Sequence, residues 1–324
     1  MIGQDHKEAV AKFLNAKKAF DFEVIASQIE VMELTNGLEG RMSISFNNKQ
    51  YYCRLSKLTG ESSMTEELSS FLQASGSPVL VNQRVGGKLI LNSDEYDVEV
   101  RTLQKGIHYQ GQSNQLYLLA EALFQLHVEL KKFPLSDKFI KSSKAYNVEL
   151  EKVQELIKQK SPKLNKVVNN WLNSNADFVE NNLLTLELNF IEGFSPQCVH
   201  GDLHPGNVLF NSEDVWFLDF EESYKTFASV NYDIGYLIIR YALPSEDSEK
   251  VYDDIYQRLR AMYGSQLLSR EDLLKYGTKI VLRLMLMAIY NGLTDNKWLG
   301  ENELNKFKNQ FELLNELSVH LNLK

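Results

Sequence analysis

The chain has 324 residues, of which 44% are hydrophobic and 24% charged, as is typical of a globular protein with one large or two modest domains. Its net charge of −8 at pH 7 argues against binding to a nucleic-acid backbone as its main activity. The two cysteines, Cys53 and Cys198, are too few for a disulfide framework or a CxxC metal site.

The first hundred residues predict one opening helix, over 6–14, followed by a strand-rich region. Residues 41–46 alternate polar and apolar side chains, as half-buried strands do. Ser63 and Glu66 form a capping box for a helix that ends at Gly76. The predicted strands cover residues 29–34, 41–46, 51–55, 88–91 and 96–103. This part therefore indicates a small antiparallel sheet that carries a helix.

Beyond residue 106 the pattern becomes helical. Residues 114–133 carry leucines at helical spacing along one face. Further helices are predicted over 146–159, 163–184, 248–264, 270–292 and 302–321. The sequence therefore predicts an α+β protein with a β-rich N-terminal domain, residues 1–104, and a helical C-terminal domain, residues 105–324.

No segment is typical of a targeting or membrane-spanning sequence. The N-terminal residues 1–13 contain no apolar core region of a signal peptide. The longest apolar stretch near the end, 280–290, is short and contains Arg283. We therefore expect a cytoplasmic protein that binds neither membranes nor nucleic acid.

A polar segment stands between two short apolar strands among the predicted helices. It reads VHGDLHPGNVLF over 199–210, and LDFEES follows at 218–223. Asp202 and Asn207 are separated by four residues, and Asp219 lies twelve residues beyond Asn207. The apolar residues in between fit a tight hairpin that would bring Asp219 back beside Asn207.

Phosphoryl transfer needs a set of this kind. One carboxylate accepts or orients the proton of the attacking hydroxyl, while a second carboxylate and an amide oxygen hold Mg²⁺ against the nucleotide phosphates. The order H-x-D-x-x-x-x-N…D-F is that of the protein-kinase catalytic loop and its metal-binding Asp. The pattern therefore predicts a kinase-type reaction.

Residues 198–237, with HGDLHPGNVLF, LDFEES and YDIG, resemble the aminoglycoside phosphotransferase and choline kinase superfamily. The segment LAEALFQLHVEL, 119–130, resembles the helix of that family that ends in L-x-x-L-H. The resemblance implies a bilobal protein-kinase-like fold, with a small antiparallel sheet in the N-lobe and a mainly helical C-lobe. It also implies Mg²⁺ as cofactor, ATP or GTP as phosphoryl donor, and a small-molecule hydroxyl as acceptor.

The resemblance implies a role for each residue of the polar segment. Asp202 would be the catalytic base, and Asn207 and Asp219 would bind Mg²⁺. His200 and Asp233 would support the catalytic loop from within the fold.

In the N-terminal domain the resemblance implies nucleotide contacts from a basic strand residue, a helix Glu, a loop over the phosphates and the hinge. The residues are Arg54 (with Lys57 as the alternative), Glu66, Gly37, Thr102 and Leu103. The loop TNGLEG, 35–40, departs from the family's usual two adjacent glycines followed by Ser-Asn. Structural roles compete here, because Glu66 also fits a capping box and Arg54 a solvated strand position.

The candidates for contacts with the acceptor are His204, Glu221 and Tyr224. A hydrogen bond within the loop explains His204 more readily than a substrate contact does. The net charge and the pair Glu221–Glu222 after Asp219 indicate an acceptor that carries an amine as well as a hydroxyl. Ring faces for an ammonium group would come from three nearby tyrosines, Tyr224, Tyr232 and Tyr236.

Two other functions are compatible with the same predicted fold. A protein Ser/Thr kinase is disfavoured because Asp219 and Asp233 are only fourteen residues apart, which leaves no long activation segment. A nucleotide-binding regulator without turnover is disfavoured because Asp202, Asn207 and Asp219 are all present. The sequence names neither the acceptor, nor the preferred nucleotide, nor the oligomeric state.

Overall fold

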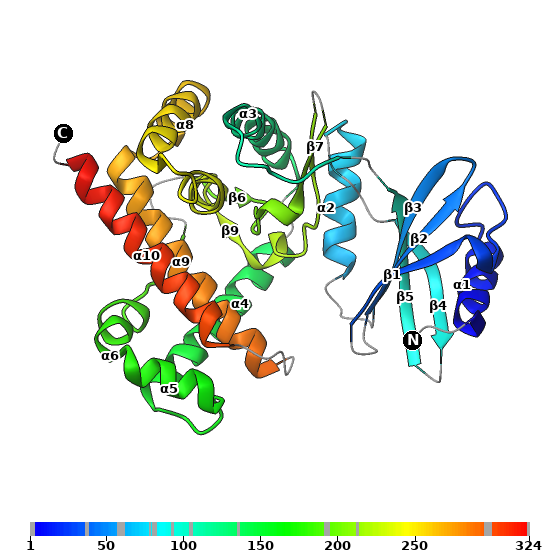
Figure 1. Ribbon diagram of the computed structural model, residues 1–324, viewed down its shortest axis with the longest axis horizontal. Helices are drawn as coiled ribbons and strands as arrows, with labels where there is room; N and C mark the ends of the chain where they lie inside the picture. Colours follow the sequence, from blue (N-terminus) through cyan, green and yellow to red (C-terminus); the bar gives the residue numbers. More distant parts are fainter. Residues whose placement is uncertain are drawn as a thin grey trace. The chain divides into compact units, whose positions relative to one another are not determined.

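The computed structural model describes residues 4–35, 39–56, 62–77, 79, 83–91, 94–103, 106–134, 137–190, 195–211, 214–294 and 300–322. The chain forms two compact units (Figure 1). One comprises Met1–Gly106 with Trp216–Leu218, and the other comprises Ile107–Val215 with Asp219–Lys324. The first unit thus ends two residues beyond the boundary expected from the sequence.

The N-terminal unit is built on a five-stranded antiparallel sheet with the strand order β1-β2-β3-β5-β4. The helices α1 (Gln4–Ala16) and α2 (Ser62–Ala74) belong to the same unit. The strands are β1 (Ile29–Thr35), β2 (Glu39–Phe46), β3 (Lys49–Ser56), β4 (Gln83–Leu91) and β5 (Asp94–Thr102). All five strands were predicted, and β4 begins five residues before its predicted start because the sequence QRVGG hides its alternation.

The two faces of this sheet differ in chemistry. On one face, Met42, Cys53 and Val100 pair across β2, β3 and β5 and join the apolar core of α1. Burying an aliphatic side chain of this size stabilises the fold by about 1.5–3 kcal/mol. The next residues along the strands, Arg41 and Arg54, pair on the opposite face. The period-two alternation of β3 therefore places Arg54 on the charged face of the sheet.

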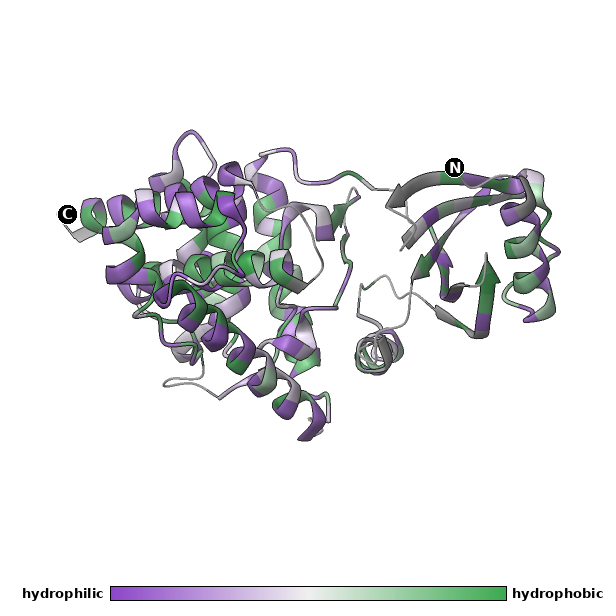
Figure 2. Cartoon of the chain, turned by 90° about the horizontal axis from the view of Figure 1, so that it is seen from below, coloured by the Kyte–Doolittle hydropathy of each residue, from purple (hydrophilic) through white to green (hydrophobic). Residues whose placement is uncertain are grey.

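Eight helices of the described chain belong to the C-terminal unit. They are α3 (Ser113–Leu130), α4 (Asp137–Lys158), α5 (Lys166–Ser174), α6 (Ala176–Phe178), α7 (Asn231–Leu237), α8 (Ser248–Tyr263), α9 (Arg270–Thr294) and α10 (Glu301–Asn322). Four short strands pair in this part of the sequence: β6 (Gln197–Cys198) with β9 (Phe227–Ala228), and β7 (Val208–Phe210) with β8 (Val215–Phe217), of which Trp216 and Phe217 belong to the N-terminal unit. In Figure 2 many hydrophobic residues of this unit lie where its helices face one another.

Three helical predictions differ from the structure. Helix α4 begins nine residues early, because Phe139 and Ser143 extend its buried face among polar neighbours that mask the pattern. The single helix expected over 163–184 is interrupted at Asn175, whose φ of −122° and ψ of 35° are not helical. Helix α7 was not predicted, because all seven of its residues are buried and it shows no amphipathic pattern.

Both cysteines are free and buried. Burial raises the pKa of the Cys53 and Cys198 thiols to about 12, so neither is a reactive thiolate at neutral pH. Within the described ranges, no helix combines the length and the apolar character that crossing a membrane requires.

Candidate active site

A buried carboxylate holds the loop of the polar segment in place. Asp233, in α7, is 0% exposed, and its Oδ2 accepts hydrogen bonds from the His200 backbone N–H at 2.7 Å and from His127 Nε2 at 2.9 Å. Its Oδ1 accepts the Gly201 backbone N–H at 2.9 Å. Burial alone would raise the pKa of Asp233, but these hydrogen bonds and the positive potential of the two histidines hold it below its ordinary value.

His127 is a site residue that the sequence analysis did not include. It lies in the last turn of α3, is buried, and places Nδ1 at 2.7 Å from the hydroxyl of Tyr263. His127 could have been found from the sequence by its position in the L-x-x-L-H segment, which is part of the family resemblance. His127 thus positions Asp233, which in turn orients the backbone that leads to Asp202.

Steric crowding explains why the HGD motif has a glycine at position 201. Gly201 has a φ of +84°, and a Cβ built there would lie 2.9 Å from the backbone oxygen of Glu222. A larger residue would therefore displace the segment that follows Asp219.

Two side chains orient Asp202. Its Oδ1 accepts the hydroxyl of Tyr236 at 3.1 Å. The amide nitrogen of Asn207 donates to the Asp202 backbone oxygen at 2.9 Å and to its Oδ2 at 3.3 Å. The side chain keeps 32% of its surface exposed, so the carboxylate is positioned but accessible to a substrate.

His204 is engaged within the loop, as the sequence analysis favoured. Its Nδ1 accepts the backbone N–H of Gly206 at 2.9 Å, so a neutral imidazole carries its proton on Nε2, 3.6 Å from Asp202 Oδ2. Burial lowers the pKa of His204 below its ordinary 6.5, and the positive charge of Arg240 adds to this effect, whereas Asp202 opposes it. The neutral form therefore prevails at pH 7.

The two proposed metal ligands flank one hairpin along the chain. Asn207 precedes β7 directly and Asp219 follows β8, so the pairing of these strands brings both residues to the same end of the hairpin. Asp219 has a φ of +58°, and its Oδ1 accepts the backbone N–H of Glu221 at 3.3 Å. The Asn207 amide oxygen has no hydrogen-bond partner among the residues that the structure describes.

This donor set fits Mg²⁺. The ion prefers carboxylate and amide oxygens, and it keeps several positions for water and substrate phosphates. One Asp and one Asn are therefore enough when a nucleotide supplies further oxygens. Consistent with that, the described ranges contain no cluster of three or more His, Cys, Asp or Glu side chains able to hold a metal by itself.

The nucleotide-contact candidates belong to the N-terminal unit. Arg54 lies on the charged face of β3, opposite Glu99 of β5. Leu103 donates its backbone N–H to the Gln50 oxygen at 2.8 Å, so only its carbonyl is left for a purine. Glu66 lies in α2 and Thr102 ends β5, but their side chains fall outside the described structure. Gly37 and Lys57 fall outside the described residues altogether.

The tyrosines expected to bind an ammonium group are not presented to an acceptor. Tyr224, Tyr232 and Tyr236 are 4%, 0% and 1% exposed. A basic side chain of the protein itself lies near each ring: Lys225 at 5.4 Å, Arg283 at 5.4 Å and Arg240 at 5.9 Å, respectively. These three tyrosines therefore pack inside the protein instead of facing an acceptor. Glu221 is only partly buried and remains the acidic acceptor candidate.

Comparisons with known proteins agree with this geometry. The chain resembles the solved structure of spectinomycin phosphotransferase APH(9)-Ia, with a TM-score of 0.60, 12% identity, and coverage of 95% of this chain and 97% of that one. For Plasmodium vivax ethanolamine kinase the TM-score is 0.56, the identity 15% and the coverage 93% and 85%. For the amicoumacin kinase hAmiN the values are 0.59, 14%, 95% and 93%. At identities this low, the structural similarity shows the shared kinase-like fold alone.

No curated protein sequence matches the chain significantly. A family model described as the phosphotransferase enzyme family matches residues 47–268, which is more than half of the chain and includes the whole polar segment. The chain is therefore a member of the phosphotransferase enzyme family, with the bilobal α+β architecture of kinase-like enzymes.

Proposed function

We propose that this enzyme transfers the γ-phosphoryl group of Mg²⁺–ATP or Mg²⁺–GTP to the hydroxyl of a small, amine-bearing molecule in the cytoplasm. The observation that carries the proposal is the anchored Asp202, which Tyr236 and Asn207 orient while it stays partly exposed. The inference that the acceptor carries an amine is based on the acidic side chain of Glu221. It agrees with the amino compounds named for the solved relatives, spectinomycin and ethanolamine.

In the proposed reaction the acceptor oxygen forms a bond to the γ-phosphorus, and the bond from that phosphorus to the β–γ bridging oxygen breaks. The nucleoside diphosphate leaves, and the acceptor proton passes to Asp202. Asn207 and Asp219 would hold Mg²⁺, which supplies charge neutralisation at the phosphates when bound. Asp233 and His127 keep the loop rigid, so that catalysis consists of positioning and electrostatic stabilisation.

The direct test is a screen of the purified protein with Mg²⁺–ATP or Mg²⁺–GTP against amino alcohols, homoserine, aminoglycosides, sugars and a generic protein acceptor. We expect nucleoside diphosphate release with an amine-bearing acceptor. Phosphorylation of the protein acceptor alone would favour the protein-kinase activity. Nucleotide binding without turnover of any acceptor would favour the regulator.

Asp219→Ala is expected to abolish most of the Mg²⁺-dependent part of ATP binding, because the variant removes the carboxylate proposed to hold the ion. Calorimetry with ATP, with and without Mg²⁺, measures this difference. Asp214→Ala is the matched control, because Asp214 is an exposed Asp in the turn at the other end of the same hairpin. If Asp219→Ala binds Mg²⁺–ATP as tightly as the wild type does, the metal site has been misplaced.

Glu221→Gln is expected to raise KM for a cationic acceptor about 1.4- to fivefold, because a partly exposed ion pair contributes about 0.2–1 kcal/mol. The same variant should leave KM for ATP unchanged. Steady-state kinetics with an amine-bearing acceptor and its uncharged hydroxyl analogue separate the two effects. An unchanged KM for the cationic acceptor rejects the role of Glu221 but not the phosphotransferase activity.

A further inference from the structure

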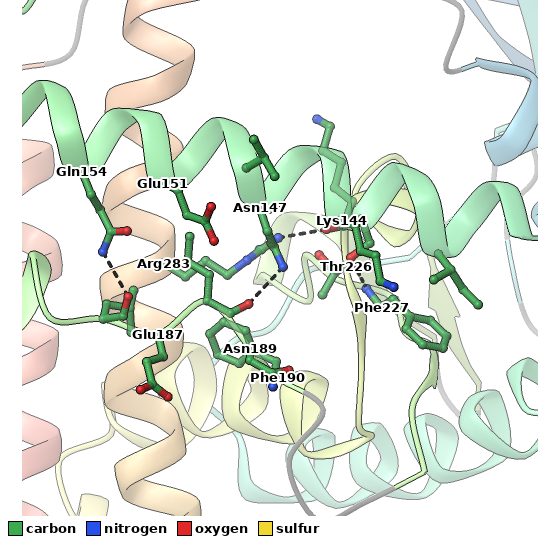
Figure 3. A pocket seen from close by; sticks show the side chains of 16 residues that line it. Lys144, Asn147, Glu151, Gln154, Glu187, Asn189, Phe190, Thr226, Phe227 and Arg283 are labelled. Atoms are coloured by element: carbon green, nitrogen blue, oxygen red, sulfur yellow. Dashed lines mark hydrogen bonds between the residues drawn. The ribbon is translucent and has the colours of Figure 1, made fainter.

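A cavity of about 750 Å³ lies within the C-terminal unit. It is bounded by one side of α4, by residues 186–190, by residues 225–227 and by Arg283 of α9 (Figure 3). Its volume falls within the range of cavities that hold small-molecule ligands, about 300–1,000 Å³. None of the residues proposed for phosphoryl transfer lines it.

The cavity contains a buried cation that forms no ion pair within the part of the chain that the structure describes. Arg283 is 1% exposed, and no carboxylate of the described residues forms an ion pair with it. Its guanidinium donates to the Tyr232 hydroxyl at 2.6 Å, the Met287 sulfur at 3.0 Å and the Lys225 backbone oxygen at 3.0 Å. These partners are all uncharged. A buried charge without a counter-ion is costly, so this position favours a ligand that brings a negative charge.

Aromatic rings offset only part of that charge. Tyr232, Tyr146 and Phe190 lie 5.4, 5.6 and 6.0 Å from the guanidinium carbon of Arg283. Such cation–π contacts stabilise a cation by about 0.5–2 kcal/mol, which is less than the cost of desolvating it.

A second buried group in the same cavity also has no partner. Thr226 is 3% exposed, and its hydroxyl makes no hydrogen bond with any described residue. An unsatisfied buried hydroxyl costs about 1–3 kcal/mol. Thr226 follows Lys225, whose carbonyl accepts a hydrogen bond from Arg283, and both Thr226 and Arg283 line the cavity.

The other charged side chains lie toward solvent. Lys144, Glu151 and Glu187 line the cavity but are exposed, so water screens their charges. The ammonium of Lys225 is paired with Glu222 at 2.8 Å. Glu222 also acts electrostatically on Arg283 from beyond ion-pair distance, so two cations, Lys225 and Arg283, share one carboxylate and the net charge beside the cavity is positive.

We propose that this cavity is a binding site for a small organic anion, whose carboxylate or phosphate group contacts Arg283 and Thr226. A guanidinium and a hydroxyl together match the oxygens of such a group. The apolar part of the ligand packs against Phe190 and the side of α4. The proposal goes beyond phosphoryl transfer and does not depend on it.

Thr226→Val provides the sharpest test, because valine keeps the shape of threonine and removes only the hydroxyl. The probes are inorganic phosphate, succinate and the uncharged analogue succinamide, added without nucleotide in thermal-shift and calorimetric titrations. We expect saturable binding of phosphate or succinate but not of succinamide. Thr226→Val should keep or raise the melting temperature of the free protein, and should weaken anion binding about tenfold.

Two further variants complete the test. Thr278→Val is the matched control, because Thr278 is a partly exposed threonine of α9 whose hydroxyl donates within its own helix, and it should bind the anion as the wild type does. Arg283→Lys keeps the charge but loses the planar pair of donors, and should weaken binding further. The proposal is overturned if neither anion binds saturably, if succinamide binds equally well, or if Thr226→Val leaves anion affinity unchanged.

Discussion

Asp202→Asn is expected to lower kcat by about 10²–10⁴, the usual effect of losing a general base. Asparagine retains an oxygen for the Tyr236 hydroxyl and nearly the same shape, but it cannot accept the acceptor proton. Nucleotide affinity should change little, because the proposed metal ligands Asn207 and Asp219 are untouched. Single-turnover kinetics and nucleotide titration measure the two quantities separately.

Tyr236→Phe is the informative companion to that variant. It removes the hydroxyl that donates to Asp202 Oδ1 but retains the buried ring and the carboxylate. We therefore expect a smaller decrease in kcat, because Asn207 still holds the other oxygen of Asp202.

Near-normal turnover in Asp202→Asn would show that another group accepts the proton.

Asp233→Asn is expected to lower the free energy of unfolding by about 3–5 kcal/mol, as breaking a buried charged network does. The His127 ring and the backbone N–H groups of His200 and Gly201 all point at the two carboxylate oxygens. An asparagine has only one oxygen, and its NH₂ group would face one of these donors. Urea unfolding at pH 7 measures the loss. Asp254→Asn, an exposed change in α8, should have no effect.

The same carboxylate predicts a pH dependence. The pKa of Asp233 in the folded protein lies below its ordinary value of 3.8, so the folded state binds fewer protons than the unfolded state in this range. The stability that Asp233 contributes is therefore fully present above about pH 4, and it is lost as the pH falls through the folded pKa. The difference in stability between wild type and Asp233→Asn should shrink in that acidic window. A difference below about 1 kcal/mol at pH 7 would contradict the structural role of Asp233.

The parts of the site that could be predicted from sequence are those that lie close together along the chain. Asp202 and Asn207 share one loop, and a short hairpin connects Asn207 to Asp219, so local spacing already implied their grouping. The strands of the N-terminal sheet were predictable for a similar reason, since alternation and turn residues are local. Asn47 and Asn48, for example, both adopt positive φ in the turn between β2 and β3.

The amino-acid sequence by itself determined the fold class, the family resemblance and the order of the Asp-Asn-Asp set, because each is expressed in local patterns of residue type and spacing. Only the tertiary structure decided which distant residues support the set. His127 reaches Asp233 across 106 positions, and Tyr236 reaches Asp202 across 34. It also decided that the three tyrosines are buried against the protein's own cations, and that Arg283 and Thr226 meet in one cavity. Such contacts depend on how helices pack, and packing brings together residues whose separation along the chain carries no periodic signal.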